Sequence, residues 1–85
     1  MKQEWLITFR SVTFAQRAER ALRRRNLSCQ LQRTPKHLTE RGCGYCLRMT
    51  GVDVPAAVEI LEREHLSYGK LYAIKEDGST EERIL

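Results

Sequence analysis

The sequence predicts a small α+β domain with the ferredoxin-like split β-α-β arrangement, in the order βαββαβ. Three observations lead to this prediction: four short runs of strand-forming residues, two stretches with helical periodicity, and their order along the chain. We therefore expect a four-stranded antiparallel sheet with two helices on one face. The other face would be left to solvent or to a partner.

The first strand and the first helix are predicted within the first 26 residues. The run WLITF at 5–9 is rich in β-forming residues. Thr13 and Gln16 have the spacing of a capping box. The apolar residues at 14, 18, 21 and 22 then repeat as on one face of a helix. Asn26 follows three arginines and would end this helix in the left-handed conformation.

The remaining elements follow from alternation and from a second helical stripe. Residues 27–32 alternate between apolar and polar types, which predicts a second strand, and Pro35 ends it. Residues 45–49 alternate in the same way as a third strand. Asp53 can cap a second helix that extends toward His65, and Tyr68–Ile74 is the last strand. We expect one domain over residues 1–75 and a polar C-terminal tail over residues 76–85.

Length and composition restrict the class of protein. At 85 residues, the chain has room for one small core. No stretch approaches the roughly 20 apolar residues of a transmembrane helix, and the first ten residues lack the apolar region of a signal peptide. Three cysteines, an odd number, argue against a disulfide framework. We expect a cytoplasmic protein without membrane association.

The net charge of +4 hides an asymmetry between the two halves of the chain. Residues 1–50 contain 11 Lys/Arg and 3 Asp/Glu, whereas residues 51–85 contain 4 and 8. The basic excess surrounds the stretch TPKHLTERGCGYCLRM. Such a field attracts anions, either nucleic acid or small anionic substrates, although a solvated basic face is equally consistent with it.

The pair Cys43 and Cys46 has the spacing of a redox motif, but the predicted strand opposes that interpretation. Positions i and i+3 of a strand face opposite sides and lie roughly 10 Å apart, whereas a disulfide requires Cα atoms within about 7 Å. The pair could bridge only if Cys43 and Gly44 still belong to a turn. No metal site is predicted, because structural sites usually have four ligands and the chain has no second Cys pair. Cys29 alternates with leucines, which indicates a buried thiol.

A single carrier or nucleophilic thiol needs fewer residues than a redox pair or a metal site. Cys43 is flanked by glycines, which open access to it and can form an anion-binding turn of backbone N–H groups. Nearby cations stabilise a thiolate and would equally stabilise a bound persulfide or selenide. The candidate anion-binding residues around this thiol are Arg33, Lys36, His37, Arg41 and Gly44.

The stretches LITFRSVTFAQRAERAL and TPKHLTERGCGYCLRM give the chain its resemblance to a known family. The chain resembles small bacterial domains described as putative selenium/sulfur carrier protein-like, over roughly residues 5–75. Its most specific part is the loop from Pro35-Lys36 to Cys43-Gly44. The resemblance implies a non-enzymatic carrier with Cys43 as the carrying residue and with no cofactor. It also implies as partners a cysteine desulfurase or other sulfur or selenium donor and an acceptor protein.

Two residues depart from the family pattern. Most members are not expected to have a cysteine at the position of Cys46, which would be either incidental on the open sheet face or a resolving thiol for a persulfide on Cys43. Lys36 stands where arginine is expected more often. The substitution keeps the charge but loses the planar fork for bidentate anion contacts.

Three other functions stay open at the level of sequence. A basic ferredoxin-like domain could bind RNA through sheet aromatics, but the aromatic and basic pattern of such a third strand is missing. The domain could be an interaction module that forms a homodimer through its open sheet face. It could also be a CxxC thiol-disulfide redox protein. The chain has no nucleophile elbow, paired-carboxylate arrangement or phosphate-binding loop that would indicate a hydrolase.

Overall fold

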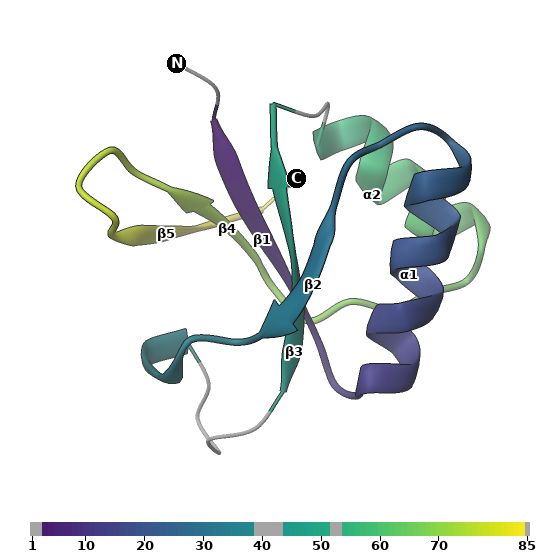
Figure 1. The fold of residues 1–85 in the computed structure, drawn as a ribbon, viewed down its shortest axis with the longest axis horizontal. Helices are drawn as coiled ribbons and strands as arrows, with labels where there is room; N and C mark the ends of the chain where they lie inside the picture. The colour runs from purple at the N-terminus through teal and green to yellow at the C-terminus, as the bar shows by residue number, and fades with distance from the viewer. Residues whose placement is uncertain (1–2, 39–43, 52–53, 85) are drawn as a thin grey trace.

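The computed structural model describes residues 3–38, 44–51 and 54–84. Both helices lie on the same side of a single five-stranded sheet (Figure 1). Among the described residues, no helix is both long and apolar enough to cross a membrane. The elements in chain order are β1 (Glu4–Phe9), α1 (Val12–Arg24), β2 (Gln30–Arg33), the 3₁₀ turn η1 (Lys36–Leu38), β3 (Tyr45–Thr50), α2 (Val54–Arg63), β4 (Leu71–Ile74) and β5 (Thr80–Arg83).

The strands are ordered β2-β3-β1-β4-β5, and every neighbouring pair is antiparallel. The first four of these strands have the order and directions that a split β-α-β arrangement requires. The prediction of a four-stranded sheet was wrong, because the segment interpreted as a polar tail contributes β5. This strand pairs with β4, with Ile74 opposite Thr80. A polar strand is compatible with an edge position, where only one of its sides is paired.

The main core lies between the sheet and the helices. Alternate residues of the central strands, among them Ile7 and Leu47, are completely buried on this side. The buried face of α1 contains Ala15, Ala18 and Ala21, whose small side chains let the helix backbone approach the sheet closely. Cys29 belongs to this core as predicted, with 7% of its surface exposed.

Each helix is followed, two positions after its last residue, by a residue in the left-handed conformation. Asn26 has φ of 63° and His65 has φ of 56°. In each case the next residue, a leucine, donates its N–H to a carbonyl in the last helical turn. This motif holds Leu27 in the connection, so β2 begins at Gln30 and not at residue 27. The predicted cap Asn26 is confirmed.

The N-terminus of α1 differs from the prediction. Ser11, and not Thr13, is the N-cap, and its Oγ accepts a hydrogen bond from the N–H of Phe14 at 3.3 Å. A capping side chain satisfies one of the N–H groups that have no partner within the helix. The predicted cap of α2, Asp53, lies outside the described residues.

Candidate functional site

The connection from β2 to β3 contains most of the residues that the sequence suggested as a site. Arg33 ends β2, Lys36 and His37 belong to η1, and Gly44 directly precedes β3. Cys43 and Arg41 lie outside the described residues. The geometry of the site is therefore defined by the residues on either side of them.

Gly44 fixes the position at which the chain enters β3. Its φ is 141°, a backbone conformation that side-chain-bearing residues rarely adopt. Its carbonyl accepts a hydrogen bond from the N–H of Thr34 at 3.2 Å. A Cβ at this position would lie 3.8 Å from the carbonyl oxygen of Phe9. The residue that follows Cys43 in sequence is thus held between the ends of β2 and β1.

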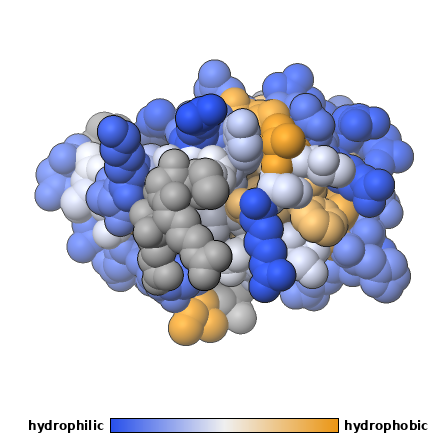
Figure 2. Space-filling view, turned by 90° about the horizontal axis from the view of Figure 1, so that it is seen from below, coloured by the Kyte–Doolittle hydropathy of each residue, from blue (hydrophilic) through white to orange (hydrophobic). Residues whose placement is uncertain are grey.

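This end of the sheet is electropositive. Arg33 and Lys36 are exposed, and Arg10, which was not among the predicted site residues, is exposed in the turn after Phe9. The N-terminus of α1 follows that turn, and its first turn contains no acidic residue. A helix N-terminus behaves as roughly half a positive charge. Figure 2 views this end of the molecule, where blue hydrophilic side chains surround a smaller orange hydrophobic area.

Arg10 could have been found from sequence by a simple signal. It is a cation placed between a predicted strand and a helix start, where its charge adds to the helix dipole. The signal is weak without the fold, because only the pairing of β1 with β3 brings Phe9 opposite Tyr45 and so brings Arg10 near Gly44.

Cys46 occupies β3 on the side of the sheet opposite the helices. It is completely buried in a small second cluster with Leu6 and Tyr72, and Leu38 of η1 packs against this cluster. Its Sγ lies 3.9 Å from the carbonyl oxygen of Arg33 and can donate to it. The prediction that this face is left to solvent or a partner therefore needs correction, because η1 covers part of it.

Burial raises the pKa of the Cys46 thiol above its ordinary value of 9.0. The side chains of Thr34 and Gln32 and the charge of Arg48 oppose this rise without cancelling it. The hydroxyl of Thr34 is itself buried and makes no hydrogen bond of standard geometry with the described residues. A thiol that stays protonated is a poor nucleophile, because the thiolate is the reactive form.

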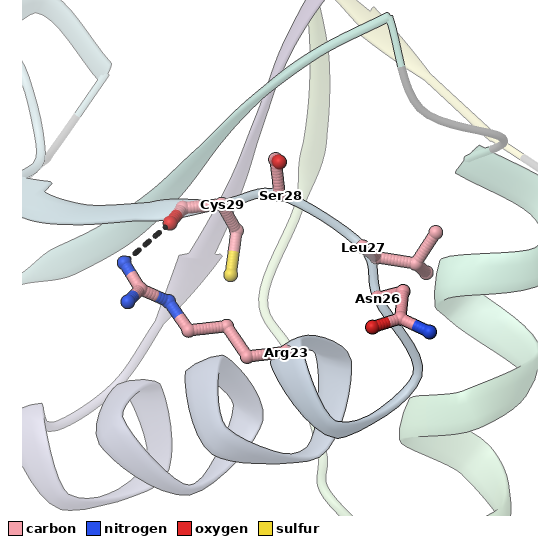
Figure 3. Close-up of a pocket in the computed structure, with 5 residues that line it drawn as sticks. All are labelled: Arg23, Asn26, Leu27, Ser28 and Cys29. Atoms are coloured by element: carbon pink, nitrogen blue, oxygen red, sulfur yellow. Dashed lines mark hydrogen bonds between the residues drawn. The ribbon is translucent and has the colours of Figure 1, made fainter.

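Cys29 is the second buried thiol, on the helix side of the sheet. Its Sγ points toward α1, while the guanidinium of Arg23 donates to the Cys29 carbonyl oxygen at 3.0 Å (Figure 3). Burial raises the pKa of this thiol as well, and the side chain of Arg23 opposes the rise. Both Cys29 and Cys46 are free thiols.

His37 has a partner on the β4–β5 hairpin. Its Nε2 lies 3.4 Å from the Oγ1 of Thr80 on β5, within hydrogen-bonding distance. Between η1 and the β4–β5 hairpin lies a groove of about 300 Å³, which has Leu6 and Arg48 in its lining. Arg48 in turn makes an ion pair with Glu4, with Nε 2.9 Å from the carboxylate. The candidate anion-binding residues are therefore divided: Arg33, Lys36 and Gly44 flank the Cys43 segment, whereas His37 contacts β5.

A metal site and an RNA-binding sheet face receive little support from the described residues. No group of three His, Cys, Asp or Glu side chains in that part of the chain could hold a metal ion. RNA-binding sheets of this fold stack bases on exposed aromatic side chains. Here Tyr45 packs on the helix side, and Tyr72 on the opposite side is only 8% exposed.

Comparison with known proteins identifies one family. The family model described as "Putative Se/S carrier protein-like" matches residues 4–73, from the start of β1 into β4. No curated protein and no solved structure matches the chain.

Proposed function

Because the chain belongs to the putative Se/S carrier protein-like family, we propose that it carries sulfur or selenium on the thiol of Cys43. It receives the atom from a donor enzyme and passes it to an acceptor protein. The chain itself acts as a carrier and not as an enzyme. The donor is a cysteine desulfurase or another sulfur or selenium donor that presents the atom on a cysteine.

The burial of the other two thiols is the observation that favours Cys43. Cys46 is completely buried and Cys29 is 7% exposed, and the pKa of each is raised by that burial. A carrier thiol must reach a sulfur atom on another protein and must ionise easily. Both buried thiols are unsuited to that task, which leaves Cys43 as the carrying residue of this proposal.

The charges around Gly44 support an anionic adduct next to it. Arg10, Arg33 and Lys36 are exposed cations, and the N-terminus of α1 adds the positive end of its dipole. Cations lower the pKa of a nearby thiol and stabilise its thiolate. The same field would stabilise an anionic persulfide and would attract acidic surfaces of a donor or an acceptor.

The transfer step is a displacement at sulfur. The Cys43 thiolate attacks the outer sulfur of a cysteine persulfide on the donor, and a new S–S bond forms on Cys43. The S–S bond of the donor breaks, and its electron pair leaves with the donor cysteine as a thiolate. Any proton on the outer sulfur moves with that sulfur. Because one S–S bond replaces another, no external oxidant or reductant is consumed. With selenium as the outer atom, the same displacement transfers selenium.

Intact mass spectrometry without reductant tests this proposal. The protein is incubated with a cysteine desulfurase and cysteine, and Cys43→Ala, Cys46→Ala and Cys29→Ala variants are run in parallel. We expect a reductant-labile gain of one sulfur atom in the wild type and in the two buried-thiol variants. Cys43→Ala should gain none.

Two other outcomes contradict the proposal. Loss of two hydrogen atoms that requires both Cys43 and Cys46 would show a redox pair, with Cys46 acting as the resolving thiol. A sulfur gain that persists in Cys43→Ala would move the carrying role to another thiol. Circular dichroism of each variant checks that the fold is retained.

A further inference from the structure

The outer face of α1 carries a dense row of arginines that the carrier chemistry does not use. The exposed members are Arg17, Arg20, Arg23 and Arg24 on the helix, followed by Arg25 at its C-cap. Residues 17, 20 and 24 follow the spacing of one helical face. With Ala21, Glu64 and Leu66, these three residues line a groove of about 210 Å³. Three of the four α1 residues that line the groove are therefore arginines.

These arginines are only partly neutralised. Arg24 makes an ion pair with Glu64 at 3.4 Å and Arg23 makes one with Glu19 at 3.5 Å, both at the exposed surface. Exposed ion pairs of this kind contribute little and exchange easily for another anion. Arg17 and Arg20 make no ion pair with any residue that the structure describes.

Acidic residues lie mainly outside α1: Glu59 and Glu62 are on α2, Glu64 follows it, and four more are on the β4–β5 hairpin. The β4–β5 hairpin contains Glu76, Asp77, Glu81 and Glu82. In Figure 1, α1 and this hairpin lie on opposite sides of the central strands. Residues 12–25 contain five arginines and one glutamate, so an anionic partner would be drawn to the outer face of α1.

We propose that the α1 arginine face binds the phosphodiester backbone of a nucleic acid without reading its sequence. An acidic protein is the less suitable partner, because protein interfaces normally have an apolar or aromatic centre that excludes charge. On α1 the large apolar residue that is exposed is Phe14, at 38%, in the first turn and outside the groove. Backbone binding needs no such centre, since neutralising phosphates and releasing counterions supplies the affinity.

The use of arginine alone on this face agrees with phosphate as the ligand. All five cations from Arg17 to Arg25 are arginines. Guanidinium groups bind phosphate oxygens in pairs through a planar fork, which an ammonium group cannot do. This inference is independent of the carrier proposal, because it uses neither Cys43 nor the cations beside Gly44.

Fluorescence anisotropy at several salt concentrations tests the inference. The probes are a labelled single-stranded RNA and a labelled DNA duplex of the same length. We compare wild type with Arg17→Gln/Arg20→Gln and with a matched control, Lys75→Gln/Arg83→Gln, which removes two cations from the opposite side. Glutamine is a good helix former, so α1 should be retained.

We expect the plot of log affinity against log salt for RNA to become shallower by roughly 0.7 for each lost phosphate contact in the α1 variant. The control should keep the wild-type slope. Binding to the RNA alone would identify a single strand as the source of the phosphates, and equal binding to the duplex would identify the backbone in general. Either result supports the inference.

Three results would overturn the inference: no binding at low salt, an equal change of slope in the two variants, or displacement of RNA by polyglutamate as effectively as by unlabelled RNA. The last result would indicate an acidic protein partner. Cys43→Ala should bind RNA as the wild type does, and Arg17→Gln/Arg20→Gln should accept sulfur normally. Failure of this inference is thereby distinguishable from failure of the carrier proposal.

Discussion

At the scale of single residues, burial separates the thiols of this chain. Cys29 lies in the core between the sheet and the helices, and Cys46 lies in the small cluster on the opposite face. Each is uncharged in an apolar environment, and for each the desolvation of a thiolate is the largest influence on the pKa. The two residues therefore stabilise the fold as small apolar side chains and resist ionisation.

This burial predicts a loss of stability at alkaline pH. The pKa of both thiols is raised above 9.0 in the folded protein. As pH rises past that value, the unfolded chain releases these protons first, so the free energy of unfolding falls until the folded thiols also ionise. Below that value the two thiols do not change the free energy of unfolding with pH. Urea unfolding from neutral pH to pH values above 9.0 measures the effect.

The matched variant is Cys29→Ala/Cys46→Ala. It will be less stable at every pH because two buried sulfur atoms are removed. Its free energy of unfolding should nevertheless fall less steeply above pH 9.0 than that of the wild type. Equal slopes would mean that neither thiol has a raised pKa.

At the scale of elements, α1 illustrates how a cap is chosen by geometry among nearby candidates. Ser11 and Thr13 are both good capping residues by type. The chain leaves β1 at Phe9, and Ser11 adopts an extended conformation with φ of −140°, which allows its side chain to turn back to the Phe14 N–H. Thr13 is already inside the helix and exposed.

We therefore expect Ser11→Ala to destabilise the protein by about 0.5–2 kcal/mol, because the N–H of Phe14 loses its partner. Thr13→Ala is the control, and it should change the free energy of unfolding much less. Urea unfolding of the two variants measures the difference. A larger loss of unfolding free energy in Thr13→Ala would mean that Thr13 is the N-cap, as the capping-box pattern predicted.

At the scale of the whole molecule, β5 changes both the sheet and the charge distribution. It places a polar edge beside β4, and two ion pairs across the hairpin, Lys70 with Glu82 and Lys75 with Glu81, join these strands. It also brings Thr80 within reach of His37 in η1. The C-terminal residues thus pack against the connection that contains Cys43, although the family match ends at residue 73.

A chain that ends at residue 75 should show the contribution of β5. We expect it to unfold at a lower temperature and to self-associate as its concentration rises, because the unpaired edge of β4 is exposed. Thermal unfolding and analytical ultracentrifugation measure the two effects. Glu81→Gln/Glu82→Gln in the full chain is the control, since it removes the charges but keeps the backbone pairing. Unchanged stability in the shortened chain would mean that β5 contributes nothing.

The local pattern of the sequence determined most of the fold. Alternation in 45–49 identified β3 and its helix-facing residues, and Asn26 was correctly expected as the left-handed cap of α1. These features depend on short-range physics: the period of two in a strand and the backbone freedom of one residue type. The family resemblance could likewise be recognised from the sequence, and the match to residues 4–73 confirms it.

Only the tertiary structure decided which polar segments join the sheet and which thiols are removed from solvent. The residues of β5, TEER, have no apolar alternation, so their pairing depends on the free edge of β4. Cys46 is buried with Leu6 of β1 and Tyr72 of β4 in a cluster against which Leu38 packs. Arg10 comes near Gly44 through the pairing of β1 with β3. Such contacts arise from the way distant segments meet, and a local sequence pattern does not record them.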